Sequence, residues 1–154
     1  MSEARELRRV AKGVTLIMND RADLCLAAGF DGVHLGQDDL SVEAARKVVG
    51  SATWVAISTH NTAQVREADS TAVDYIAVGP VFATSSKRNP DPAIGLEGVR
   101  EARRATQKPL VAIGGIKRTN CRDVIAAGAD SVAVISDLLE SPGKSVEDFL
   151  RILG

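Results

Sequence analysis

Residues that could bind a metal ion or a phosphate follow several short apolar runs in this 154-residue chain. Asp20 comes two residues after the end of one run, and Asp39 follows the next run along the sequence. One or two carboxylates, completed by water and substrate phosphates, are the usual ligands of Mg²⁺ in proteins. The pair therefore predicts a magnesium site. Asp is also favoured at the N-terminal cap of a helix, so each residue could instead cap the helix that follows it.

Two later turns predict a phosphate site. Gly114 and Gly115 follow an apolar run and precede a helical pattern, so their backbone N–H groups could approach an anion closely. Ile135 and Ser136 follow the next run. In βα-barrels a phosphate often binds at the turns after the last two strands, which these turns would be. The alternative is that the glycines serve only a tight turn with positive φ.

The longest stretch between predicted elements extends from residue 79 to residue 94. Loops of this length in a compact domain are usually functional or disordered. Thr84, Ser86 and Lys87 offer hydroxyl groups and a positive charge that suit a phosphate group. A solvated, flexible loop is the alternative interpretation.

The histidines and cysteines give weaker signals. His60 follows Ser58 at the end of a run and could act as an acid or base, whereas His34 lies within a run, as a hydrogen-bonded core histidine does. Two histidines without a cysteine cluster do not make a zinc site. Cys25 and Cys121 both lie in apolar helical patterns, which predicts buried, reduced thiols and not a disulfide.

The apolar runs predict six parallel strands, because a strand covered on both faces reads as continuous Val, Ile and Leu. These strands are expected at 16–18, 33–35, 55–57, 76–78, 111–113 and 132–135. Amphipathic segments of helical spacing alternate with them, at 3–12, 22–28, 42–49, 61–69, 96–106, 119–127 and 145–153. Active-site groups in such sheets lie at the carboxyl ends of the strands, which is where the candidate ligands occur.

Helix caps support several of these segments. Ser41, Thr119 and Ser145 are the expected N-terminal caps, and Gly29 and Gly128 are expected to terminate helices in the left-handed conformation.

Similarity between segments of the sequence supports a repeated unit. The segments 27–33, 71–76 and 126–132 resemble one another as helix-to-strand turns. Strands and helices that alternate about every 20 residues indicate βα units with right-handed connections, which curl a parallel sheet toward a barrel. We therefore predict an α/β fold: a TIM-type (β/α) barrel, incomplete, with about six of the eight βα units. A single partial barrel domain is expected to span residues 1–154.

Composition narrows the class of partner. The chain has 19 Lys and Arg against 20 Asp and Glu, a net charge of −1, which gives no electrostatic footprint for nucleic acid or an anionic membrane. The sequence has no apolar run of 18 residues and no cationic leader. We expect a cytoplasmic protein whose partners are small phosphorylated molecules.

As a set, these motifs resemble the thiamine-phosphate synthase family, from about Glu6 to the C-terminus. The resemblance is carried by residues 17–21, 32–39, 58–60, 79–82 with 84–87, 112–116 and 134–136. It implies a Mg²⁺-dependent transferase that joins hydroxymethylpyrimidine diphosphate to a thiazole phosphate, giving thiamine phosphate and diphosphate.

The same resemblance implies roles for individual residues. Asp20 and Asp39 would hold Mg²⁺. Asn19, Ser58 and Lys87 would contact the pyrimidine diphosphate. The thiazole phosphate would contact Thr84, Ser86, the Gly114–Gly115 turn and the Ile135–Ser136 turn. Lys87 and Ser58 are the expected catalytic residues, and Lys87 would stabilise the charge on the departing diphosphate.

The chain departs from the family pattern in two ways. Ser86 stands where the family usually has Thr, which keeps the hydroxyl group. The family's first strands and a basic Gln-x-Arg-x-Lys segment have no counterpart in this sequence. We therefore expect open sheet edges, weak or no synthase activity of this chain alone, and a homo-oligomer that covers those edges.

Two alternatives remain open. One is a thiazole tautomerase-like relative, which would not need the metal-binding carboxylates, so that Asp20 and Asp39 argue against it. The other is a non-catalytic partial barrel that binds a phosphorylated ligand.

Overall fold

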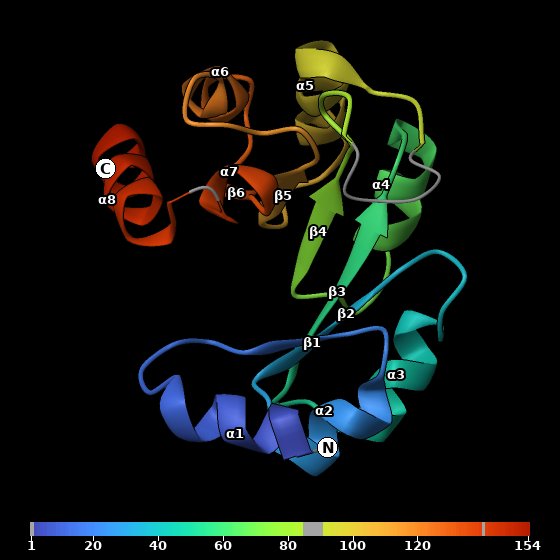
Figure 1. The fold of residues 1–154 in the computed structure, drawn as a ribbon. Coiled ribbons are helices and arrows are strands. Elements are labelled where there is room, and N and C mark those ends of the chain that lie inside the picture. The colour runs from blue at the N-terminus through green and yellow to red at the C-terminus, as the bar shows by residue number, and fades with distance from the viewer. Residues whose placement is uncertain (1, 85–90, 140) are drawn as a thin grey trace.

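The computed structural model of the chain describes residues 2–84, 91–139 and 141–154. Its strands form one curled parallel sheet in the order β1-β2-β3-β4-β5-β6, with helices between successive strands (Figure 1). The strands are β1 Ile17–Asn19, β2 Gly32–Leu35, β3 Trp54–Thr59, β4 Tyr75–Val78, β5 Leu110–Ile113 and β6 Ser131–Ala133. The helices are α1 Ser2–Val10, α2 Ala22–Ala28, α3 Val42–Val49, α4 Thr62–Asp69, α5 Gly95–Ala105, α6 Cys121–Ala126, α7 Ser136–Leu139 and α8 Pro142–Leu153. The predicted incomplete βα-barrel with six strands is confirmed.

Some helices and strands have other boundaries than those predicted from the sequence. Strand β6 ends at Ala133, so residues 134 and 135 lie beyond it, and the short helix α7 follows. Helix α8 begins at Pro142, and the predicted cap Ser145 lies inside that helix, where its hydroxyl group donates to the carbonyl oxygen of Asp137. Thr119 is not the cap of α6, since Asn120 occupies that position.

Other local predictions are confirmed. The hydroxyl group of Ser41 accepts a hydrogen bond from the backbone N–H of Ala44 at 3.2 Å, as an N-terminal cap does. Gly29 ends α2 with a φ of 67°. Cys25 and Cys121 are both buried and free.

Small and branched apolar residues build two contiguous parts of the core. One part lies beneath β1 to β5 and includes the fully buried Val33, Leu35 and Ile76. The other lies around β5, β6, α6 and α8 and includes Val124 and Phe149. Aromatic residues make up only 3% of the chain, so aliphatic burial is the main driving force for this fold.

Among the described residues, one arrangement occurs three times at the amino ends of the strands. It explains why the segments 27–33, 71–76 and 126–132 resemble one another. An Asp that precedes an even-numbered strand accepts a hydrogen bond, at 2.7–2.8 Å, from a backbone N–H at the start of the neighbouring odd-numbered strand. The same carboxylate pairs with an Arg of the helix that precedes the odd-numbered strand. We call each set an Arg–Asp latch. The three latches are Arg8, Asp31 and Leu16; Arg46, Asp74 and Val55; and Arg103, Asp130 and Leu110.

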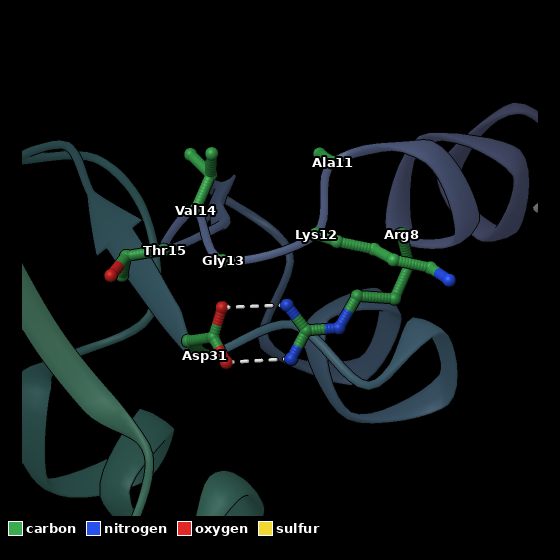
Figure 2. Close-up of a pocket in the computed structure, with 7 residues that line it drawn as sticks. All are labelled: Arg8, Ala11, Lys12, Gly13, Val14, Thr15 and Asp31. Carbon is green, nitrogen blue, oxygen red and sulfur yellow. Dashed lines mark hydrogen bonds and ion pairs between the residues drawn. The ribbon is translucent and has the colours of Figure 1, made fainter.

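The first latch is drawn in Figure 2. Both carboxylate oxygens of Asp31 meet the guanidinium group of Arg8, at 2.6 and 2.8 Å. A shallow hollow of about 480 Å³ lies beside this pair, lined also by residues 11–15. Arg8 holds the pKa of Asp31 below its ordinary value, through its hydrogen bonds first, so the pair stays ionised at neutral pH.

We expect Asp74→Ala to destabilise the chain by about 1–3 kcal/mol, because the backbone N–H of the buried Val55 loses its acceptor. Asp74→Asn should cost less, since an amide oxygen can still accept that bond while the charge facing Arg46 is lost. Urea unfolding measures both changes. Glu67→Ala, at an exposed position of α4, is the matched control and should be nearly neutral. Equal stability of the Asp74→Ala and control variants would show that the latch does not stabilise the fold.

None of the helices in the described ranges is both long enough and hydrophobic enough to cross a lipid bilayer.

Candidate active site

The carboxyl ends of the strands surround a cavity of about 700 Å³, a size typical of sites for small molecules. The cavity gathers most of the residues that the sequence singled out: Asn19, Asp20, Asp39, Ser58, Thr84, Gly114, Gly115, Ile135 and Ser136. Ser86 and Lys87 lie outside the described residues. Side chains separated by more than 100 positions in the sequence thus line one space.

The two candidate metal ligands face each other. Asp20 follows β1 and Asp39 follows β2, and their carboxyl groups are in hydrogen-bond contact. The pKa of Asp20 is raised, first by burial and then by the hydrogen bond and the negative charge of Asp39. A hydrogen bond from Asn19 lowers this pKa and so partly opposes the rise. Two carboxyl groups in such close contact repel each other when both are ionised, and a bound cation would relieve that repulsion.

The backbone holds both carboxylates in place. Asp20 has a φ of 63°, a conformation uncommon for residues other than glycine and often found at functional sites. Its backbone N–H donates to the carbonyl oxygen of His34 at 2.8 Å. The carboxylate of Asp39 accepts a hydrogen bond from the backbone N–H of Gly36 at 2.7 Å. Neither Asp side chain is the N-terminal cap of the following helix, because Arg21 and Ser41 hold those positions.

This donor set fits Mg²⁺. A metal site built wholly from protein ligands would need three or more His, Cys, Asp or Glu side chains close together. No such group occurs among the described residues. Mg²⁺ usually keeps several waters and binds one or two carboxylates together with substrate phosphates. Asp20 and Asp39 supply two carboxylates, and the open cavity leaves room for the remaining oxygen ligands.

Ser58 lies at the end of a hydrogen-bond chain that the sequence did not reveal. His34 contacts the Ser58 hydroxyl group through Nε2 at 2.8 Å and the Tyr75 hydroxyl group through Nδ1 at 3.1 Å. Burial lowers the pKa of His34, so the ring is neutral and carries one donor and one acceptor nitrogen. Both ring nitrogens are satisfied, as predicted, but the ring also lines the cavity. Strand alternation could have indicated this, since Val33 and Leu35 point to the opposite, buried face.

The glycine turn after β5 has room for no side chain. Gly114 and Gly115 have φ values of 95° and 63°, and a Cβ on Gly115 would lie 2.6 Å from the carbonyl oxygen of Ala83. The residues after β4 pack directly on this turn, and Phe82 donates a backbone hydrogen bond to Gly114. The turn is therefore fixed by neighbouring backbone, and Thr84 is brought to the same side of the cavity.

His60 contacts the segment after β4 at two places. Its Nδ1 donates to the carbonyl oxygen of Gly79 at 2.6 Å, and its Nε2 lies 3.5 Å from the carboxylate of Asp91. The sequence suggested an acid or base. His60 also lines the cavity, and its two contacts tie it to the segment that carries Thr84.

Comparison with known proteins supports the family that the motifs suggested. Residues 1–138 match the family described as thiamine monophosphate synthase. A thiamine-phosphate synthase from Koribacter versatilis is 61% identical over 154 residues, which cover 99% of this chain and 73% of the relative. One from Methanoregula boonei is 46% identical over 140 residues, covering 90% of this chain and 65% of the relative.

A solved structure gives the same result. Thiamine phosphate pyrophosphorylase from Pyrococcus furiosus superposes with a TM-score of 0.88 at 31% identity, over 99% of this chain and 74% of that one. The chain thus spans roughly two-thirds to three-quarters of the length of these three relatives. On sequence and fold, the chain belongs to the thiamine monophosphate synthase family.

Proposed function

We propose that the chain transfers a hydroxymethylpyrimidine group from its diphosphate to the ring nitrogen of a thiazole phosphate, giving thiamine phosphate and diphosphate. The observation that carries this proposal is the composition of the cavity. A pair of carboxylates follows β1 and β2 at one end of the sheet, and two turns suited to a phosphate group follow β5 and β6 at the other end. All of them line the cavity. The reaction needs these two kinds of subsite, because both substrates are phosphorylated.

The carboxylate side would hold the diphosphate. Asp20 and Asp39 would bind Mg²⁺ together with diphosphate oxygens, and Asn19 lies beside them. The metal would stabilise the negative charge that develops on the departing diphosphate. Lys87, which lies between β4 and α5 in the sequence, is proposed to add a second positive charge, and Ser58, oriented by His34, a hydroxyl group.

The glycine side would hold the thiazole phosphate. The turn at Gly114 and Gly115 would offer backbone N–H groups. Thr84 and Ser136, which line the cavity, would add hydroxyl groups, and Ser86 is proposed to add another. In the transfer, the bond between the pyrimidine methylene carbon and the diphosphate oxygen breaks, and its electron pair leaves with the diphosphate. The thiazole nitrogen then forms the new bond to that carbon with its own lone pair. The protein supplies proximity and orientation and needs no covalent nucleophile.

A direct assay tests the proposal. The chain is incubated with both substrates and Mg²⁺, and thiamine phosphate is measured against a reaction without protein. Product should form above that background, although slowly, because the chain alone is expected to have weak activity. It should disappear with EDTA and return with excess Mg²⁺. Binding of the thiazole phosphate without any product would favour the non-catalytic phosphate-binding alternative. Metal-independent isomerisation of the thiazole phosphate would favour the tautomerase-like relative.

Two further predictions follow from the family. We propose a cytoplasmic location for this biosynthetic activity. We also retain the prediction that copies of the chain pair through their sheet edges, since β1 and β6 each have one strand neighbour among the described residues. Light scattering would contradict that pairing by showing a monomer at high concentration.

A further inference from the structure

The two turns proposed to bind the thiazole phosphate are neighbours in the sheet. Strands β5 and β6 pair with Ile113 opposite Ala133, and Gly115 and Ser136 each follow their strand within a few residues. Both turns line the cavity. A phosphate held between them would require a fixed separation of the two turns.

A polar contact joins these turns outside the cavity. The carboxylate of Asp137 accepts hydrogen bonds from the backbone N–H of Arg118 at 3.0 Å and from its guanidinium Nε at 2.9 Å. Arg118 follows the Gly115 turn, and Asp137 is adjacent to Ser136. Neither Arg118 nor Asp137 is among the described residues that line the cavity. The contact therefore connects the two walls without reaching the ligand space.

The contact is buried and anchored to α8. The side chain of Asp137 is only 10% exposed. The carbonyl oxygen of Asp137 accepts from the fully buried hydroxyl group of Ser145, and the guanidinium of Arg118 also donates to Asp148 at 3.2 Å. Burial raises the pKa of Asp137, but the hydrogen bonds from Arg118 outweigh burial and hold the pKa below its ordinary value. A negative charge is thus maintained one residue from the proposed phosphate contact at Ser136.

We propose that the Arg118–Asp137 pair positions the two phosphate-binding turns and cancels the carboxylate charge beside them, so that the thiazole phosphate can bind. This inference rests on the proposed function, because it assumes that the turns hold that phosphate. Without the Arg118 guanidinium, the buried carboxylate would repel an incoming phosphate, and the backbone N–H of residue 118 alone would still join the turns. The pair acts through the turns, and both members are positioning residues.

Three variants separate the two effects. Arg118→Met removes the charge and keeps the length of the side chain. It should weaken binding of the thiazole phosphate about tenfold or more, while the KM for the pyrimidine diphosphate changes less than about twofold. The double variant Arg118→Met, Asp137→Asn should regain much of this affinity, because the unpaired carboxylate is gone. Arg118→Lys keeps the compensating charge and should stay within about threefold of the parent chain.

The measurements are calorimetric titration with the thiazole phosphate and separate KM values for both substrates. Lys144→Met is the matched control. Lys144 contacts Asp148 at the exposed end of the same network, and its loss should leave both KM values unchanged. Thermal unfolding of each variant identifies losses that come from misfolding. If Arg118→Met does not fold, the comparison of Arg118→Lys with the double variant tests the charge requirement.

The outcomes are distinct. An equal rise in the KM for both substrates would overturn the role of the pair while leaving the synthase function intact. No recovery in the double variant would overturn charge cancellation and leave positioning of the turns as the role of the pair. Binding of the thiazole phosphate that depends on Arg118, without any turnover, would support the pair and contradict the synthase function. A parent chain that binds neither substrate would contradict both proposals.

Discussion

Replacing Asp20 by Asn is expected to lower Mg²⁺-dependent formation of thiamine phosphate by about 10²–10³-fold. Asn is close in shape to Asp and tolerates the positive φ of this position, so the backbone should be retained. The change removes one of the two carboxylates that face each other in the cavity. Turnover measured over a range of Mg²⁺ concentrations should show a higher Mg²⁺ concentration at half-maximal rate and a lower maximal rate.

The same variant should not be less stable than the parent chain. The pKa of Asp20 is raised in the fold, by burial first and then by Asp39, so the folded state binds a proton more tightly than the unfolded state. Ionised Asp20 therefore costs stability above that pKa, and the cost falls as pH drops through it. Thermal unfolding at neutral pH without metal should give an equal or higher midpoint for Asp20→Asn. Loss of activity without loss of stability is the expected sign of a functional group.

Asp23→Asn is the matched control for this experiment. Asp23 lies in the first turn of α2, pairs with Arg21 on the surface and is 60% exposed. Its replacement should leave the Mg²⁺ dependence of turnover unchanged. If Asp20→Asn and Asp23→Asn behave alike, the facing carboxylates do not hold the metal.

Gly79→Ala is expected to destabilise the fold by about 3 kcal/mol or more. A Cβ at this position would lie 2.1 Å from the backbone carbonyl oxygen of Ile113, so strand β5 would have to move away from the end of β4. The backbone carbonyl of Gly79 also accepts the hydrogen bond from His60. The displacement would therefore disturb the segment that carries Thr84 as well as the sheet.

Urea unfolding and thermal unfolding measure the effect of Gly79→Ala. Gly143→Ala is the control, because a Cβ there has no atom within 4 Å and Gly143 lies in helix α8. That variant should be neutral or slightly more stable, as Ala favours helix. A loss of less than about 1 kcal/mol for Gly79→Ala would show that β4 and β5 separate easily.

The fold was predictable because burial leaves a direct trace in this sequence. Runs such as 55–57 and 76–78 are apolar on both faces, which only a covered parallel strand requires. The candidate ligands were also predictable, since parallel strands bring their carboxyl ends to one rim. The predicted order of parallel strands was therefore enough to expect Asp20 and Asp39 close together.

The boundaries around β6 were less predictable. The run that ends at Ile135 is apolar throughout, although Ile135 is 57% exposed and lies beyond the strand. Helix α8 starts three residues before the predicted segment, because Ser145 resembles an N-terminal cap in sequence whereas Pro142 stands in the first turn of the helix. Ser145 faces the core there and donates to Asp137, a partner that only the tertiary structure supplies.

Long-range polar contacts could not be predicted either, because their partners also come together only in the tertiary structure. His34 and Tyr75 are 41 positions apart, and Arg118 and Asp137 are 19 apart. No local pattern identifies such partners. They depend on the register of the strands, which places His34 of β2 beside Ser58 at the end of β3.

The Arg–Asp latches and the cavity lie at opposite ends of the same strands. Tolerance to mutation should divide along this line. Changes around the cavity can alter which molecule is bound while the latches keep the strands in register, whereas changes in a latch would weaken every chemistry that this scaffold could support. Directed evolution toward a new phosphorylated substrate should accordingly accumulate its substitutions around the cavity and leave Arg46, Asp74, Arg103 and Asp130 unchanged.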